Sequence, residues 1–400
     1  MELGSLKILA LSDAGCTTGF GRVAHELYSR WVGAGHEVHV IAINYLGDPW
    51  ESDYKLYPAA KYNQQDVYGT ARVVEMLHKI KPDILFMLND LPVLSDILFN
   101  NPYDVEKQAL RHKVVMYAPV DSDGLPPKFL MPTSAGTVVA MSKWGADQLS
   151  EATGKDIQHI HHGVSHDKFY RADSLHPIQV ELRGKHTITS KKQAKKFLGW
   201  GDKFVIIDIN RNSPRKNHYD TFKIFAEFSK KVPEAILYAH TKIKDVGGDL
   251  FHLTERLGIT NKVIFPKDLD TFVGLPDHMI NLLYNASDVK LSTSYGEGFG
   301  LTDAEALACG VPVIAQDFSA TTEVVGDGGI LIKPVGKWST SLMTDLAVPD
   351  NDEFVKQLFY LYENGKVRGE LGNKGIKHAS HFQWDKVAND FLDVFKGVLA

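Results

Sequence analysis

The chain has little of several features that would mark particular classes of protein. It contains only two cysteines in 400 residues, Cys16 and Cys309, so we expect no disulfide framework and no cysteine metal site. No apolar run reaches the length needed to span a bilayer. The formal net charge is only −5, which argues against broad nonspecific binding to nucleic acid but does not exclude a local basic patch. The cysteine usage makes a reducing, cytoplasmic setting the simplest expectation.

The bulk composition is that of an ordinary globular protein. It is 44% hydrophobic and 23% charged, without a low-complexity tract. A length of 400 residues favours two domains over one core. The apolar run Leu6–Leu11 near the start is too short for a signal peptide and lacks a small-residue cleavage site, so we expect a strand there.

Apolar strand patterns alternate with helical patterns through the first part of the chain. Helical spacing is seen in Arg22–Val32 and Val67–Ile80. Strands are expected at Leu6–Asp13, Glu37–Ile43, Asp83–Leu88, Lys113–Val120, Thr137–Met141 and Ile157–Val164. This alternation predicts a parallel sheet covered by helices.

A polar, mixed stretch at residues 171–200 interrupts the alternation, and we interpret it as the crossover into a second domain. Its lysine run, Lys191–Lys196, is expected to be a solvated helix face. The alternation then resumes. The expected strands are Phe204–Ile209, Ala235–Ala239, Val263–Phe265, Val289–Ser294 and Val313–Ala315. The expected helices are Asp220–Lys231, Leu250–Leu257, His278–Asn285, Leu301–Cys309, Asp352–Asn364 and Trp384–Leu399.

These patterns predict two doubly wound α/β domains at residues 1–170 and 171–380, followed by a C-terminal helix at 381–400. In such sheets ligands bind beyond the carboxyl ends of the strands, where loops lead into helices. If the two domains face each other, we expect the ligand in the cleft between them.

Two carboxylates bracket a glycine-rich turn in the segment Glu297-Gly-Phe-Gly-Leu-Thr-Asp-Ala-Glu305. An apolar strand leads into the turn and a helix follows it, ending at Gly310 with Pro312 just beyond. A helix N-terminus points backbone N–H groups and a positive dipole end at whatever lies above it, usually a phosphate. Because carboxylates hold hydroxyls, a sugar nucleotide is the ligand that fits both halves. The alternative is a surface loop before an ordinary helix with scattered acids.

Three cations follow the first strand of the second domain: Arg211, Arg215 and Lys216. A departing diphosphate needs such charges to stabilise it. We expect Arg211 and Lys216 to be the ligands, because Pro214 would turn the chain so that they converge. A solvated charge cluster is the alternative.

A glycine turn in the first domain, Gly19-Phe20-Gly21, opens a helix as a phosphate-binding turn would. It is not a full dinucleotide fingerprint, and a plain tight turn is the alternative. Asp121 and Asp123 follow another strand of this domain and would project into the cleft; an Asx-type turn before Gly124 is equally plausible.

Four histidines crowd the segment His159–His166. On a strand His159 and His161 would point to one face and His162 to the other, and no carboxylate accompanies them at a useful spacing. We therefore favour polar packing at a strand end over a zinc site, and we expect no metal.

These motifs together resemble the retaining glycosyltransferases of family 4, which have the GT-B fold, over most of the chain. The family's two-acid motif is similar to Glu297–Glu305, its Arg/Lys pair to Arg211 and Lys216, and its glycine loop to Gly19-Phe20-Gly21. The segment Gly163–Phe169 and the C-terminal Phe382–Ala388 resemble further family stretches.

The resemblance implies roles. Glu305 would hold ribose hydroxyls and Glu297 the donor sugar, while Arg211 and Lys216 would neutralise the leaving diphosphate without a metal or cofactor. Backbone N–H groups of the turn would contact sugar and phosphate; its residues are Gly298, Phe299, Gly300, Leu301 and Thr302. Many members carry a histidine where this chain has Val120-Asp121, so Asp121 is the candidate to replace its contact with the sugar.

The sequence thus predicts a retaining transfer of a hexose-like sugar from a nucleotide diphosphate to a hydroxyl of a glycan, lipid or small molecule. Alternatives are transfer to a modified DNA base, a sugar-nucleotide epimerase, a glycan phosphorylase, or a non-catalytic sugar-nucleotide-binding protein. We expect the base near Phe265–Asp270 and the acceptor near the loops Asn44–Tyr62 and Asn89–Asp104.

Overall fold

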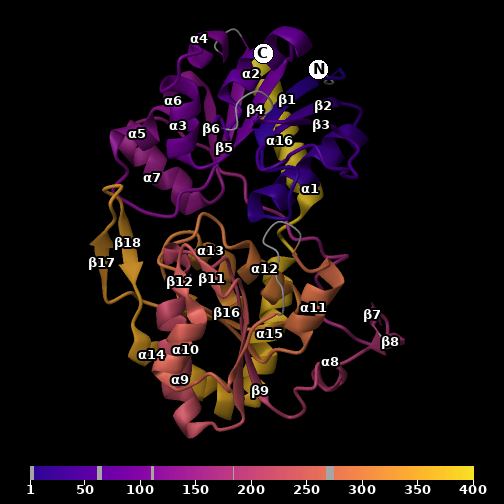
Figure 1. Ribbon diagram of the computed structural model, residues 1–400, viewed down its shortest axis with the longest axis vertical. Helices are drawn as coiled ribbons and strands as arrows, with labels where there is room; N and C mark the ends of the chain where they lie inside the picture. The colour runs from indigo at the N-terminus through magenta and orange to yellow at the C-terminus, as the bar shows by residue number, and fades with distance from the viewer. Residues whose placement is uncertain (1–3, 61–64, 110–111, 183, 267–273) are drawn as a thin grey trace. The chain divides into compact units, whose positions relative to one another are not determined.

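The computed structural model describes residues 4–60, 65–109, 112–182, 184–266 and 274–400. The chain divides into two compact units (Figure 1). The first unit comprises Met1–Gly163, Ser341–Thr344 and Gln383–Ala400, and the second comprises Val164–Thr340 and Asp345–Phe382. The boundaries expected from the sequence were residues 170 and 380. None of the described helices is both long and apolar enough to cross a membrane.

The first unit is built on a six-stranded parallel sheet in the order β3-β2-β1-β4-β5-β6. Its strands read as nearly continuous apolar runs, as expected when both faces of a sheet are covered. They are β1 Lys7–Ser12, β2 Glu37–Ala42, β3 Lys55–Pro58, β4 Ile84–Leu88, β5 Lys113–Ala118 and β6 Thr137–Ala140. The predicted parallel sheet is therefore confirmed.

One predicted strand of this unit, Ile157–Val164, was wrong. Only an isolated bridge joins His159 to Ala140, because the chain leaves the sheet after Ile160. The N–H of Val164 instead donates to the carbonyl of Phe382 at 3.0 Å. His162 is buried at this departure, with Nδ1 2.7 Å from the Tyr117 hydroxyl.

The helices of the first unit include one that replaces a predicted loop. The helices are α1 Gly19–Gly33, α2 Thr70–Ile80, α3 Leu91–Phe99, α4 Val105–Ala109, α5 Pro127–Leu130, α6 Pro132–Ala135, α7 Lys143–Thr153 and α16 Trp384–Leu399. The segment Asn89–Asp104, expected to be an acceptor loop, contains α3. Pro92 in its first turn fits a helix start, since that position needs no intrahelical N–H.

The last helix of the chain completes the core of the first unit. In Figure 1 the yellow α16 lies against the indigo α1. Phe391 places its ring 6.0 Å from Trp31, 5.3 Å from Phe86 and 4.8 Å from Tyr117. The indole N–H of Trp31 donates to the carbonyl of Ala388 at 3.2 Å. The end of the chain is thus tied into the sheet formed by its beginning.

The second unit repeats the design with a sheet in the order β13-β10-β9-β14-β15-β16, again all parallel. Its strands are β9 Phe204–Ile209, β10 Ala235–His240, β13 Val263–Ile264, β14 Val289–Ser292, β15 Val313–Gln316 and β16 Gly329–Ile332. Its helices are α8 Lys191–Phe197, α9 His218–Lys231, α10 Leu250–Leu257, α11 Asp277–Asn285, α12 Leu301–Ala308, α13 Thr321–Val325, α14 Asn351–Glu363 and α15 Gly365–Ala379. β9 and β14 occupy the centre.

Three antiparallel hairpins, which the sequence did not predict, extend this unit. They are β7 Ile178–Glu181 with β8 Lys185–Ile188, β11 Lys244–Asp245 with β12 Gly248–Asp249, and β17 Gly336–Ser339 with β18 Asp345–Val348. The first falls within the stretch expected to be an irregular crossover.

The lysine run on α8 is largely the solvated face that was predicted, since Lys191, Lys192 and Lys196 are exposed, and Lys195 is the exception. Lys195 is only 12% exposed, and its Nζ lies 2.6 Å from a carboxylate oxygen of Asp288. Lys191, one turn earlier, reaches the other oxygen of the same carboxylate at 3.3 Å. Both lysines therefore fasten α8 to the amino end of the central strand β14.

We predict that Phe391→Ala destabilises the first unit by about 3–5 kcal/mol, because removing a fully buried ring that packs against four others would leave a cavity. Urea unfolding followed by circular dichroism measures the loss. Leu399→Ala, a change at a position 37% exposed on the same helix, is the control and should leave stability nearly unchanged. Equal effects of both changes would contradict the anchoring role of Phe391.

Candidate active site

The two-acid segment leads from the central strand β14 into α12, as predicted. Gly300 is the N-cap of α12, and its φ of +98° lies in the left-handed region that favours glycine. The helix is followed by Gly310, where a Cβ would lie 2.2 Å from the guanidinium of Arg171. The strand, glycine turn and helix N-terminus therefore occur where the sequence placed them, at the carboxyl edge of the sheet.

Glu297 is buried and receives two cations from the loop after β9. Lys216 Nζ lies 2.6 Å from one carboxylate oxygen, and Arg215 Nη1 lies 3.0 Å from the other. Arg215 also donates to the carbonyl of Gly296, and its own carbonyl accepts from the N–H of Tyr295 at 2.9 Å. Two loops far apart in sequence are thereby joined at one carboxylate.

These two cations determine the charge state of Glu297. Burial alone would raise the pKa of its carboxyl, but the charges of Lys216 and Arg215 outweigh burial and hold that pKa well below its usual range. Burial lowers the pKa of Lys216, and the Glu297 carboxylate opposes that shift. Glu297 is therefore a buried carboxylate that stays ionised.

The backbone of Glu297 is fixed as firmly as its side chain. Its N–H donates to the hydroxyl of Ser319 at 2.8 Å, and its carbonyl accepts from the N–H of Ala320 at 3.3 Å. Ser319 itself has φ of +56°, an uncommon conformation for a residue other than glycine. Such a conformation costs energy and persists only where the surrounding structure holds it in place. Conformations of this kind are often found at functional sites.

Arg211 lies elsewhere. Its guanidinium is 59% exposed and makes a two-point ion pair with Asp245 of β11, at 2.9 Å and 3.3 Å. At Glu297 it is Arg215 that accompanies Lys216, and the roles of Arg211 and Lys216 at a diphosphate stay a prediction. The side-chain amide nitrogen of Asn212 lies within 3.2 Å of three carbonyl oxygens, those of Lys242 and Ile243 just before the β11–β12 hairpin and of Gly248 within it.

Glu305, the second acid, is 1% exposed in the second turn of α12. The hydroxyl of Tyr284, from α11, lies 3.2 Å from its Oε2 and 3.0 Å from the carbonyl of Thr302. Tyr284 thus offers Glu305 a neutral donor, whereas Lys216 and Arg215 contact Glu297.

The N-terminal turn of α12 supplies backbone N–H groups between the two acids. The N–H groups of Asp303 and Ala304 donate to the carbonyl of Gly300 at 2.9 Å and 3.2 Å. Those of Leu301 and Thr302 belong to the first turn, which has no intrahelical acceptors. Phe299 is 3% exposed and packs edge-on against Phe382 at 5.4 Å, which fixes the turn.

In the first unit the glycine turn is the first turn of α1 rather than a loop before it. The N–H of Gly21 donates to the N-cap side chain of Thr18 at 3.1 Å. A Cβ on Gly21 would lie 2.0 Å from the carbonyl of Cys16, so close backbone packing requires this glycine. Gly19 has open space around it, and Phe20 is partly exposed.

The remaining predicted groups of the first unit are two aspartates and the histidines of residues 159–166. Asp121 and Asp123 follow β5 and are half-buried. Of the histidines, His162 is buried against Trp384, with ring centroids 5.9 Å apart, and burial lowers the pKa of its imidazole to about 3. Within the described ranges no three His, Cys, Asp or Glu side chains form a group that could hold a metal.

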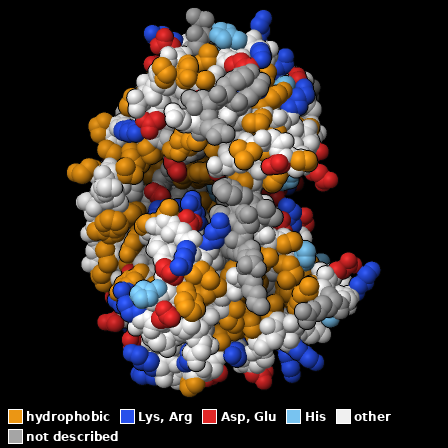
Figure 2. Space-filling model, viewed as in Figure 1, with side chains coloured by type: hydrophobic (Ala, Val, Ile, Leu, Met, Phe, Trp, Pro, Cys, Tyr) orange, Lys and Arg blue, Asp and Glu red, His pale blue; other side chains and the backbone are white. Residues whose placement is uncertain are grey.

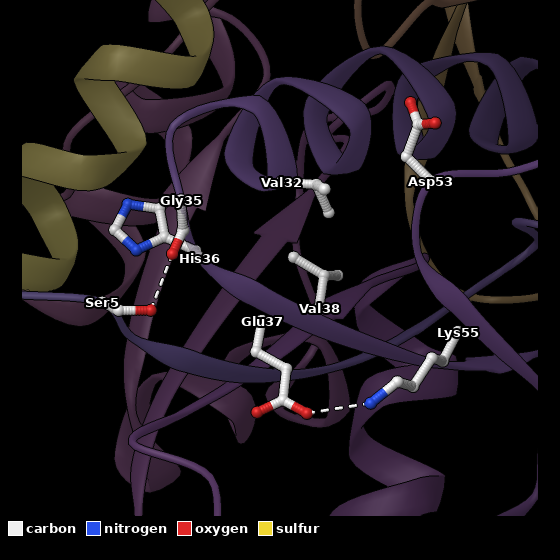
Figure 3. A pocket seen from close by; sticks show the side chains of 8 residues that line it. All are labelled: Ser5, Val32, Gly35, His36, Glu37, Val38, Asp53 and Lys55. Atoms are coloured by element: carbon white, nitrogen blue, oxygen red, sulfur yellow. Dashed lines mark hydrogen bonds and ion pairs between the residues drawn. The ribbon is translucent and has the colours of Figure 1, made fainter.

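A pocket of about 290 Å³ lies in the first unit, but at the opposite edge of its sheet (Figure 3). Glu37 begins β2 and Lys55 begins β3, so the pocket lies at the amino ends of these strands. Their side chains pair with each other at 2.9 Å, and the Ser5 hydroxyl donates to the carbonyl of Gly35. Since ligands of doubly wound sheets bind at the carboxyl edge, this pocket is not the candidate active site.

Two groups at the site were missed from the sequence. Arg215 was noted only as part of a charge cluster, and Ser319 carried no signal because its contact with Glu297 spans two strands. The predicted base region Phe265–Asp270 lies largely outside the described residues, as does the end of the Asn44–Tyr62 loop.

Comparison with known proteins agrees with this arrangement. Residues 190–378, which contain both acids and the cation loop, match the family model described as Glycosyl transferases group 1. D-inositol 3-phosphate glycosyltransferase 2 of Catenulispora acidiphila is 26% identical over 66% of this chain and 56% of the relative. Trehalose synthase of Pyrococcus horikoshii is 26% identical over 49% of this chain and 45% of the relative. The chain thus spans about half the length of these relatives.

Solved structures extend the likeness to nearly the whole chain. A glycosyltransferase from Rickettsia africae superposes with a TM-score of 0.72 at 17% identity, covering 99% of both chains. Anabaena HepE, solved with UDP and glucose, gives a TM-score of 0.70 at 18% identity, covering 98% of this chain and 100% of that one. The chain has the GT-B fold, and the family match supports a glycosyltransferase.

We predict that Glu297→Gln lowers stability more at pH 7 than at pH 3. The folded-state pKa of Glu297 lies below its unfolded value of about 4.5, so its stabilising contribution is complete above that pH and fades as the pH falls below it. Urea unfolding of both proteins across this range measures the difference. A penalty that does not change with pH would contradict the ionised pairing of Glu297.

Proposed function

We propose that this chain is a retaining glycosyltransferase of family 4 that moves a hexose-like sugar from a nucleotide diphosphate to an acceptor hydroxyl. The observation that carries the proposal is the pair of buried acids flanking the N-terminus of α12, with Lys216 and Arg215 at the first acid. The likeness to HepE, whose structures hold UDP, glucose and UDP-glucose, supports a nucleotide-sugar donor.

In the proposed complex each part of the site has a separate task. Glu305 accepts hydrogen bonds from ribose hydroxyls, and Glu297 accepts them from hydroxyls of the donor sugar. The turn amides from Gly298 to Thr302 face sugar and phosphate, since a helix N-terminus favours anions. The positive charges of Lys216 and Arg211 stabilise the leaving diphosphate.

The proposed transfer is balanced without another reactant. The bond from the anomeric carbon to the donor phosphate breaks, and a bond to the acceptor oxygen forms on the same face of the sugar. The acceptor proton passes to the leaving phosphate. Because lysine and arginine supply positive charge at the site, we propose that no divalent metal is needed.

The remaining assignments concern the setting and the acceptor. We propose a cytoplasmic protein, because Cys16 and Cys309 are unpaired thiols and the donor is an intracellular type of metabolite. We propose that Asp121 takes the place of the family histidine in contacting the donor sugar, and that the turn Gly19-Phe20-Gly21 contacts substrate. Acidic and basic side chains are interspersed on the face shown in Figure 2, which with a net charge of −5 favours a small or glycan acceptor over DNA.

The first test is thermal stabilisation by a panel of nucleotides and sugar nucleotides. A donor at a hundred times its dissociation constant should stabilise the wild type by about 2.7 kcal/mol. Glu305→Ala should lose this effect, whereas Glu370→Ala, at an exposed position on α15, should keep it. If no ligand of the panel stabilises the wild type, both the transferase and the donor-binding protein are contradicted. If a donor stabilises the wild type but no turnover is seen, a non-catalytic binding protein is favoured.

The second test is the product of transfer or of donor hydrolysis. We expect the released sugar to keep the anomeric configuration of the donor when its first-formed anomer is followed by proton NMR. We also expect the rate to be unchanged in EDTA. An inverted product, or a rate that EDTA abolishes, would overturn retention or metal independence respectively.

The same assay tests the separated arginine. Arg211→Met should lower kcat about 10²- to 10³-fold, the effect of losing one transition-state donor. Arg256→Met, an exposed change on α10, is the matched control and should leave kcat unchanged. If Arg211→Met is also without effect, Arg215 rather than Arg211 is the partner of Lys216 in catalysis.

A further inference from the structure

A second buried ion pair lies directly beneath the turn that carries the two acids. Lys290 is the second residue of β14 and is 0% exposed; Asp303 is the third residue of α12 and is 1% exposed. The ammonium of Lys290 contacts Oδ1 of Asp303. The hydroxyl of Ser292 donates to the other carboxylate oxygen at 3.2 Å. A central strand is thus clamped to the first turn of α12 by charge.

Stability alone does not account for this pair. β14 lies between β9 and β15 in the middle of the sheet, where its neighbours are apolar side chains. Replacing a buried ion pair by well-packed apolar residues is often neutral or stabilising, because both ions must leave water. What an ion pair adds is a fixed geometry between its two elements.

The geometry that is fixed here belongs to the turn. The N–H of Asp303 donates to the carbonyl of Gly300 at 2.9 Å. A Cβ on Gly300 would lie 3.2 Å from Oδ2 of Asp303, so the carboxylate packs directly against the left-handed residue of the turn. Movement of the Asp303 side chain would therefore displace the backbone between Glu297 and Glu305.

The pair also lies within electrostatic reach of other charges of the unit. Burial lowers the pKa of Lys216, and the carboxylates of Glu297 and Asp303 both oppose that shift. Burial raises the pKa of Asp208, at the carboxyl end of β9, but His218 and then Lys290 lower it. Asp208, Lys290, Asp303, Lys216 and Glu297 thus form a series of alternating charges from the sheet to the site.

We propose that Lys290 and Asp303 are positioning residues, which hold the first turn of α12 and its amides in the geometry that binds the donor diphosphate. The inference rests on the proposed function for its ligand, but the clamp itself is a property of the empty protein. The Lys290–Asp303 pair would thus hold the backbone of the turn in place, which neither Glu297 nor Glu305 does.

The same unit contains a matched control. Lys195 and Asp288 form a comparable pair, with side chains 12% and 8% exposed, but at the amino end of β14. The N–H of Asp288 donates to the carbonyl of Val205, at the start of β9, so this pair lies at the edge of the sheet away from the turn. Neutralising it tests the loss of a buried pair without disturbing α12.

The experiment compares Lys290→Met/Asp303→Asn with Lys195→Met/Asp288→Asn, each of which removes one cation and one carboxylate together. The control also takes Asp288 from Lys191, but that lysine is 44% exposed, so water can solvate its ammonium. Hydrogen exchange of the amides of residues 298–304 is measured first, without ligand. We expect these amides to exchange at least tenfold faster than in the wild type in the first double variant. In the second double variant we expect their exchange rates to be unchanged. If these amides exchange at the wild-type rate in the first double variant, the proposed clamp is wrong, whether or not any ligand binds.

The second measurement uses UDP as the probe. We expect its dissociation constant to rise at least tenfold in Lys290→Met/Asp303→Asn and to stay within twofold of wild type in the control. Ser292→Ala, a milder change to the same cluster, keeps the test open if the double variant does not fold, and should weaken UDP two- to fivefold. Faster exchange with unchanged UDP affinity would overturn the positioning role.

Failure of the proposed function gives a different result. In that case the wild type binds neither UDP nor any sugar nucleotide of the panel, while the exchange comparison still decides whether the clamp exists.

Discussion

The candidate site depends on one constraint: β9 and β14 are parallel neighbours at the centre of the sheet. Their carboxyl ends must therefore lie side by side, which brings Lys216 and Glu297 together although 81 residues separate them. The ion pair at 2.6 Å and the bond from Tyr295 N–H to the Arg215 carbonyl then join the two loops. Because the partners are buried, water cannot replace them cheaply, and the loops behave as one structure.

The two acids have different surroundings, and this difference is chemically useful. Two cations hold Glu297 ionised, so its charge does not depend on a ligand. Glu305 has the neutral hydroxyl of Tyr284 at 3.2 Å. A carboxylate has about four lone-pair sites, so Glu305 can accept from ligand hydroxyls as well as from Tyr284, as the proposed ribose contact requires. The turn between the acids is held from below by Lys290 and Asp303 and from the side by Phe299.

Local patterns predicted the fold and the position of the site well. The ranges predicted for β9, α10 and α16 match the structure, because buried strands and amphipathic helices have a hydrophobic pattern that is visible in consecutive residues. The turn between the acids was found because glycine, acid and helix signals are adjacent. Contacts between distant segments were not predictable: Arg215 rather than Arg211 meets Glu297, and Lys195 is drawn inward by Asp288. Such choices depend on which strands pair, which no local spacing reveals.

The three cations after β9 all have a carboxylate partner: Lys216 and Arg215 share Glu297, and Arg211 has Asp245. An anion that enters therefore meets cations that are already paired, and it must share or displace these carboxylates. The exposed Arg211 can exchange its partner at little cost, because ion pairs in contact with water are weak. The buried Lys216 cannot, since separating it from Glu297 would leave a charge without compensation. It follows that a bound diphosphate would share Lys216 with Glu297 and draw Arg211 away from Asp245.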